Sequence, residues 1–98
     1  MIFYIVKTMR VEEIEGSLLW NDSSDAIYID SQMAYDVVRF NQADISENGY
    51  NQYAIVLATK GGLYPEVQEL TWFKWDSVEN KYVQCDRPDI MNGYSLTV

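Results

Sequence analysis

The side chains that most often do chemistry at neutral pH are nearly missing from this chain. It has no histidine and a single cysteine, Cys85. Histidine is the usual general base and the commonest metal ligand, so its absence rules out histidine-activated nucleophiles and the usual zinc sites. Gly61 and Gly62 are not followed by the Lys-Ser/Thr of a phosphate-binding loop. We therefore expect no metal, no cofactor and no enzymatic activity.

Carboxylates are the one reactive group in good supply. Two of them suffice for glycoside hydrolysis, but fifteen acids in 98 residues can meet in pairs by chance, so the pattern has little specificity. The oxygen-rich residues 21–25 resemble the start of a calcium loop. Counted from residue 21, however, positions 6 and 12 hold Ala26 and Gln32 instead of the Gly and Glu of an EF-hand. We interpret residues 21–25 as a polar turn between two strands, and Cys85 as a small buried residue.

Charge is the strongest compositional signal. Fifteen acids against seven bases give a net charge of −8. Residues 11–36 hold seven acids and no Lys or Arg, whereas the other 72 residues hold eight acids and seven bases and are nearly neutral. A chain of this charge is repelled by nucleic acid and by anionic membranes, so we expect a basic protein surface as its partner. The seven acids are Glu12, Glu13, Glu15, Asp22, Asp25, Asp30 and Asp36.

These seven acids are the candidate partner-binding residues. In an extended chain, Glu13 and Glu15 would lie about 6.6 Å apart on one side, a spacing comparable to that of alternate phosphates in a DNA strand. The leading hypothesis is a non-catalytic inhibitor that mimics nucleic acid and occupies the basic nucleic-acid-binding site of a partner protein. Small acidic proteins of phages and mobile elements act in this way against restriction enzymes or CRISPR complexes, an analogy of charge and size. The plainer interpretation is a solvated acidic segment that limits aggregation.

A second candidate surface is aromatic. In a strand, Trp72 and Phe73 point to opposite faces, so one face can lie under a helix while the other must be covered or exposed. Aromatic residues on a sheet can stack with single-stranded nucleic acid, but that binding needs a positive groove, which this chain lacks. The alternative function is thus a protein–protein interaction module or small structural subunit. Its binding residues would be Trp72, Trp75, Tyr64 and Tyr82, unless they only pack in the core.

The periodicity of apolar residues predicts one helix and five or six strands. Asp30 or Ser31 is a suitable N-cap for a helix over residues 32–44. Residues 53–59 are apolar until their end, which favours a central strand buried on both faces. Residues 76–80 are predicted to form a hairpin loop. The predicted strands are residues 2–9, 26–29, 53–59, 67–75, 81–85 and, as a last short strand, 94–98.

The order β-β-α-β-β-β with a single helix predicts an α+β fold. We expect one acidic domain over residues 1–98, with a mainly antiparallel sheet of four to six strands and the amphipathic helix on one face. Residues 2–6 are too short an apolar run for a signal peptide or a membrane span. We therefore expect a monomer or homodimer in the cytoplasm, which would be the host's if a phage encodes it. The predicted core contains Ile5, Met33, Val37, Phe40, Ile55, Leu57 and Trp72.

Overall fold

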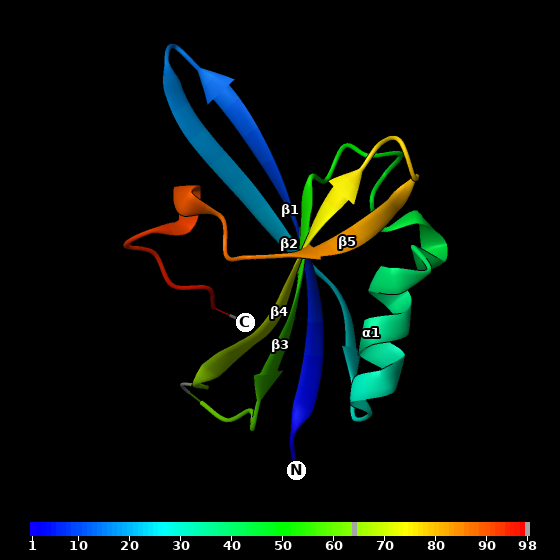
Figure 1. Cartoon of the computed structure of the whole chain (residues 1–98). Helices are drawn as coiled ribbons and strands as arrows, with labels where there is room; N and C mark the ends of the chain where they lie inside the picture. Colours follow the sequence, from blue (N-terminus) through cyan, green and yellow to red (C-terminus); the bar gives the residue numbers. More distant parts are fainter. Residues whose placement is uncertain (64, 98) are drawn as a thin grey trace.

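In the part of the chain that the structure describes, five antiparallel strands form one sheet in the order β2-β1-β3-β4-β5, and one α-helix packs on one face of it (Figure 1). The computed structural model describes residues 1–63 and 65–97. The predicted α+β fold and its order of elements are confirmed. The elements are β1 (Phe3–Ile14), β2 (Ser17–Tyr28), α1 (Ser31–Arg39), a 3-10 turn (Gln42–Asp44), β3 (Tyr53–Thr59), β4 (Val67–Asp76), β5 (Lys81–Cys85) and a second 3-10 turn (Asp89–Met91).

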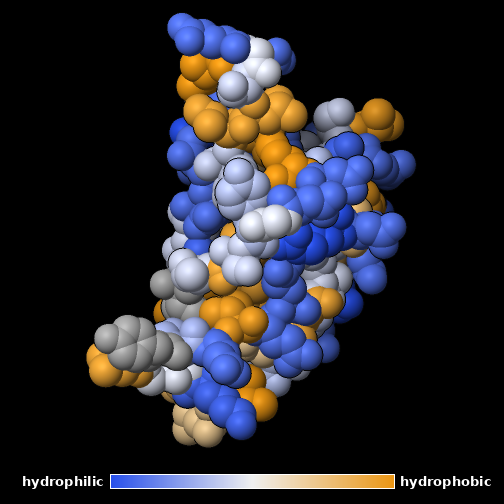
Figure 2. Space-filling model, turned by 90° about the vertical axis from the view of Figure 1, so that its left-hand side faces the viewer, coloured by the Kyte–Doolittle hydropathy of each residue, from blue (hydrophilic) through white to orange (hydrophobic). Residues whose placement is uncertain are grey.

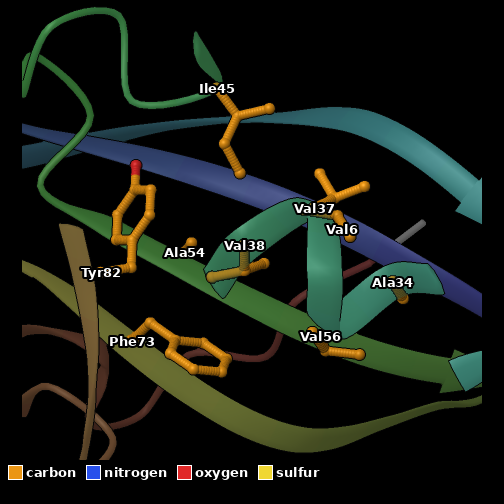
Figure 3. Packing of buried hydrophobic residues seen from close by; sticks show 9 residues of the cluster. All are labelled: Val6, Ala34, Val37, Val38, Ile45, Ala54, Val56, Phe73 and Tyr82. Atoms are coloured by element: carbon orange, nitrogen blue, oxygen red, sulfur yellow. The ribbon is translucent and has the colours of Figure 1, made fainter. Parts of the chain in front are cut away.

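The central strand β3 separates two cores. Six of its seven residues are buried, which confirms that its apolar run is covered on both faces. The helix covers one face (Figure 3). The segment after β5 covers the other face, where Met91 and Leu96 are buried. The helix-side core contains Val6, Ala34, Val37, Val38, Ile45, Ala54, Val56, Phe73 and Tyr82. The opposite core contains Ile5, Met9, Ile55, Leu57, Trp72, Met91 and Leu96.

The helix is shorter than predicted, and it is rotated relative to the predicted apolar face. Asp30 is its N-cap, because its Oδ1 accepts a hydrogen bond from the Gln32 backbone N–H at 2.7 Å. The helix ends at Arg39 because the backbone then turns left-handed, with φ of 45° at Asn41. The buried helix residues are Ala34, Val37 and Val38.

Two predicted core residues of the helix are therefore wrong. Met33 is 52% exposed and Phe40 is 71% exposed. Rotation of the buried face toward Val38 leaves Met33 outside, and Phe40 lies at the C-cap, where the chain has already left helical geometry. The other predicted core residues are confirmed as buried: Ile5, Val37, Ile55, Leu57 and Trp72.

The first two strands are much longer than predicted. Residues 21–25, predicted to form a turn, lie inside β2, and the chain reverses instead at Glu15 and Gly16, with φ of 51° and 80°. Positive φ at both residues is typical of the two-residue hairpin turns that match the twist of a sheet. The polar residues fit a strand because β2 is an edge strand with nine exposed residues.

The predicted last strand is also wrong in its described part. Residues 94–97 lie in no strand, and Val98 lies outside the described residues. Leu96 is buried at 8% exposure because this segment lies over the face of the sheet and does not pair with an edge. The predicted hairpin loop between β4 and β5 is confirmed.

Candidate functional site

The outer half of the β1–β2 hairpin extends beyond the rest of the sheet (Figure 1). β1 pairs with β3 only between Phe3 and Met9, whereas its pairing with β2 continues to Ile14 opposite Ser17. We call residues 10–21 the projecting ribbon. Two-stranded hairpins are at best marginally stable in water, so the ribbon needs support from its surroundings.

Three contacts support the ribbon from the body of the protein. The ring of Trp20 meets that of Tyr94 edge-on, with 4.3 Å between the centroids. The side-chain amide of Gln52 accepts a hydrogen bond from the Val11 N–H at 2.7 Å and donates one to the Val11 carbonyl at 3.3 Å. The Gln52 side chain therefore makes the two hydrogen bonds to Val11 that the backbone of a longer β3 would make.

The end of the ribbon exposes three large apolar side chains. Ile14 is 50% exposed, Leu18 58% and Leu19 47%. Figure 2 shows apolar atoms gathered just below the hydrophilic upper end of the molecule. The sequence analysis did not predict these residues, although the apolar run over residues 18–20, just after the Gly16-Ser17 pair, was a readable signal. Exposed apolar residues gathered in one place often mark an interaction surface.

Three of the candidate acids surround this apolar end. Glu12 lies opposite Leu19 in the ladder and Glu13 lies opposite Leu18, so the two carboxylates are on different sides of the ribbon. Glu15 lies in the turn. The expectation that Glu13 and Glu15 lie on one side of an extended strand is wrong, because the chain reverses at Glu15.

Glu12 contacts Arg10 of the ribbon and Tyr50 of the body through polar groups. The Nε of Arg10 lies 2.9 Å from the Oε1 of Glu12. The Tyr50 hydroxyl donates to the same Oε1 at 3.4 Å and accepts from the Arg10 guanidinium, which also lies over the Tyr50 ring. Glu12 is therefore partly compensated, whereas Glu13 and Glu15 are exposed and take part in no hydrogen bond or ion pair found among the described residues.

Asp22 and Asp25 are bonded to buried polar residues of β1. The Lys7 ammonium, with the residue only 6% exposed, donates to Asp22 Oδ1 at 2.6 Å. The Thr8 hydroxyl donates to Asp25 Oδ2 at 2.6 Å. Asp25 is the extra residue of a β-bulge, since the ladder passes from Val6 opposite Ala26 to Lys7 opposite Ser24. These two acids therefore have structural partners within the hairpin.

The last two candidate acids belong to the helix. Asp30 caps its first turn, and Asp36 Oδ1 accepts a hydrogen bond from the Gln32 side chain at 2.8 Å. The fold therefore brings Glu12, Glu13 and Glu15 together at the ribbon end but does not join all seven acids into one continuous face.

A second acidic region, near Tyr82, was not predicted from the sequence. Burial raises the pKa of Tyr82, and the charges of Asp25, Asp44 and Glu47 raise it further. Asp44 has a lowered pKa because its carboxylate accepts hydrogen bonds from the Asn48 backbone and from the side chains of Ser46 and Asn41. Asp25 is distant in the sequence from Asp44 and Glu47, so no local pattern could have joined the three acids into one region.

The aromatic candidates lie mostly in the core. Trp72 is 5% exposed and donates its indole N–H to Glu69 at 2.7 Å. Tyr82 is 4% exposed and donates to the Asn51 carbonyl at 2.8 Å. Trp75 is half-buried against the Tyr82 ring, with 5.1 Å between the centroids. Tyr64 lies outside the described residues. The three described candidates, Trp72, Trp75 and Tyr82, thus form no exposed patch comparable with the ribbon end.

A groove of about 570 Å³ lies between the ribbon and the segment after β5. Its apolar lining includes Val11, Leu18 and Ile90, and its polar lining includes Glu13 and Lys74. Cys85 is half-buried, and burial raises the pKa of its thiol, which disfavours the reactive thiolate.

Comparison of the chain with protein-family models, curated proteins and solved structures gave no match. Within residues 1–63 and 65–97, no group of three or more acidic or cysteine side chains is placed to hold a metal ion. None of the helices in this described part of the chain has the length and apolar character needed to cross a bilayer.

Proposed function

We propose that this chain is a non-catalytic inhibitory binding protein that presents its projecting ribbon to the basic, nucleic-acid-binding surface of a partner protein. The observation that carries the proposal is the combination at the ribbon end of exposed carboxylates, Glu13 and Glu15, with exposed Ile14, Leu18 and Leu19. The partner could not bind DNA or RNA at the same time, because the carboxylates would pair with the Lys and Arg side chains that otherwise bind phosphates. Such a role suits a nucleic-acid mimic of the phage anti-restriction or anti-CRISPR type, acting in the host cytoplasm.

The two kinds of side chain would contribute differently to binding. An exposed ion pair contributes roughly 0–1 kcal/mol, so the carboxylates act together and mainly accelerate association. Complete burial of Leu or Ile contributes about 1.5–3 kcal/mol, and these side chains are already half-covered, so about 1 kcal/mol each remains. The apolar residues would therefore determine how long the complex lasts, and the acids how fast it forms.

The first test compares two charge variants with the same change in net charge. A partner captured from a lysate by the wild-type protein is purified and its binding kinetics are measured. Replacing Glu12, Glu13 and Glu15 with Gln should slow association at least tenfold and abolish competition with a nucleic-acid duplex. The matched control replaces three exposed glutamates outside the ribbon with Gln: Glu47, Glu66 and Glu79.

The control variant should associate within about twofold of wild type. Raising the salt from about 0.05 to 0.5 M shortens the screening length about threefold, so it should slow the wild type far more than the ribbon variant. Equal association of all three proteins would disprove the acidic mechanism. Binding that never competes with nucleic acid would instead favour the alternative, an interaction module without mimicry.

The second test addresses the apolar end of the ribbon. Replacing Leu18 and Leu19 with Ser removes about 2 kcal/mol in all, so it should increase the dissociation rate about thirtyfold and leave the association rate nearly unchanged. Val78, which is 88% exposed in the β4–β5 turn, offers a matched control as Val78→Ser. If the control dissociates as fast as the double variant, the apolar end has no role in binding.

A further inference from the structure

The outer edge of β2 is a long strand edge without a neighbour in the described part of the chain. β2 ends the strand order β2-β1-β3-β4-β5, spans twelve residues and contains no proline. The opposite edge, β5, has five residues and is followed at once by a segment containing Pro88. Open edges invite pairing with another chain, and proteins usually shorten or cover them. The β2 edge is interrupted by the bulge at Asp25, but its ribbon half, residues 17–22, is regular.

The register identifies which backbone groups face outward. The turn at Glu15 and Gly16 is closed by Ile14 opposite Ser17, which is the hydrogen-bonded pair of a two-residue hairpin. Alternation then directs the N–H and C=O groups of Leu18, Trp20 and Asp22 away from β1. The same alternation on β1 directs the groups of Val11 toward β3, where Gln52 binds both of them.

The charge at this edge disfavours a second copy of the chain as its occupant. Residues 10–25 hold five acids and one base, Arg10, which pairs with Glu12, and Lys7 pairs with Asp22. The hairpin therefore keeps a negative net charge, with Glu13 and Glu15 unpaired among the described residues. Two such edges would repel each other when paired, because like charges on neighbouring strands are destabilising. A strand carrying Lys or Arg would be attracted instead.

We propose that the outer edge of β2 binds an extended segment of a partner, one that carries Lys or Arg at alternating positions, as an added sixth strand. Backbone hydrogen bonds to Leu18, Trp20 and Asp22 hold the segment, and the carboxylates of Glu13 and Glu15, unpaired among the described residues, favour its basic side chains. The inference rests on the proposed function, because it specifies how a basic partner meets the ribbon. The bulge at Asp25 ends the regular edge and so limits the added strand to the ribbon half of β2.

The test uses the intact protein and a defined probe, a twelve-residue peptide of alternating lysine and valine with blocked ends. Amide hydrogen exchange is measured by NMR with and without the peptide at millimolar concentration. The amides of Leu18, Trp20 and Asp22 should become at least fivefold more protected. The amides of Leu19 and Asn21, which already bond to β1, should change by less than twofold.

Two control peptides separate backbone pairing from charge. A peptide of alternating glutamate and valine should give no protection, because the carboxylates of β2 repel it. The lysine–valine peptide with every backbone nitrogen methylated keeps its charges but cannot donate a hydrogen bond, and it should also give none. Protection without the alternation between outward and inward amides, or no protection by the lysine–valine peptide, would overturn the proposal. Protection that rises with protein concentration alone would also overturn it, since a second copy would then be the occupant.

The outcome is independent of the charge variants described above. If the peptide fails while the Glu12, Glu13 and Glu15 variant still loses its partner, strand addition is wrong and the proposed function stands. If the peptide protects the edge while that variant binds its partner normally, the edge is a strand-binding site and the nucleic-acid mimic is wrong.

Discussion

The body of the protein and the projecting ribbon are built from the same sheet but are stabilised in different ways. In the body, β3 is buried on both faces and each face has its own core. The ribbon has no core of its own, and Trp20, Val11 and Arg10 attach it to the body through Tyr94, Gln52 and Tyr50. At the ribbon end, Ile14, Leu18 and Leu19 are left about half exposed.

This difference separates stability from binding. Substitutions in the body should change the free energy of unfolding. Substitutions at the ribbon end should change the affinity for a partner more than they change that free energy. Local opening of the ribbon should also require less free energy than global unfolding, because few buried contacts hold it. The predictions below test this division, from the largest expected effect to the smallest.

Ile55→Ala should destabilise the body most. Ile55 is 1% exposed at the centre of β3, so truncation leaves a cavity and should lower the free energy of unfolding by about 2–5 kcal/mol. Phe40→Ala is the control, since Phe40 is 71% exposed and its truncation should change that free energy by less than about 0.5 kcal/mol. Urea unfolding measures both variants. A larger loss for Phe40→Ala would contradict the observed orientation of the helix.

Asp22→Asn should destabilise the hairpin where the ribbon joins the body. The buried Lys7 ammonium would lose its carboxylate partner, which should cost about 1–3 kcal/mol because Asp22 itself is partly exposed. Adding Lys7→Met should recover part of the loss, which a double-mutant cycle by urea unfolding can measure. If the two substitutions were simply additive, the ion pair would have no role in stability.

Tyr82→Phe should remove stability in a pH-dependent way. At pH 8 the loss of the hydrogen bond to Asn51 should cost about 1 kcal/mol. The folded pKa of Tyr82 is raised above its usual value of 10.0, so the unfolded chain ionises first as the pH rises. The stability contributed by the neutral hydroxyl is therefore full below pH 10 and declines above it. Urea unfolding at pH 8 and 10.5 should show a smaller difference between wild type and variant at the higher pH.

Gln52→Ala should loosen the ribbon and leave the body intact. Removing both hydrogen bonds to Val11 should cost about 1 kcal/mol locally, so ribbon amides should exchange roughly five- to tenfold faster. Amides of β3 should keep their exchange rates, which NMR measures in the same experiment. Uniformly faster exchange would show that the ribbon and the body open as one unit.

Glu15→Asn should have the smallest effect, a slight stabilisation of the ribbon. Glu15 has a φ of 51°, and Asn tolerates this left-handed conformation better than Glu, so about 0.5 kcal/mol is expected. Glu15→Val should do the opposite, because a β-branched residue resists positive φ. Ribbon hydrogen exchange can rank the three proteins, and an order with Val above Asn would contradict the turn geometry.

Several features of the fold could be predicted from the sequence because they depend on neighbouring residues. The continuous apolar run of β3 predicted its burial on both faces, and the Asp30 cap was readable beside the helix it begins. The missing histidine and the concentration of acids in residues 11–36 are likewise properties of the chain itself. Each of these signals reports on a single element.

Only the tertiary structure decided how these elements meet. The register of β1 with β2 placed Glu12 and Glu13 beside Leu19 and Leu18, and the short pairing of β1 with β3 left the ribbon projecting. Periodicity could not show that the helix buries Val38 instead of Met33, because both fit a helical repeat. Strand pairing, helix rotation and exposure depend on contacts between residues far apart in the chain, so the local pattern of charge indicated the acidic segment but not the surface it forms.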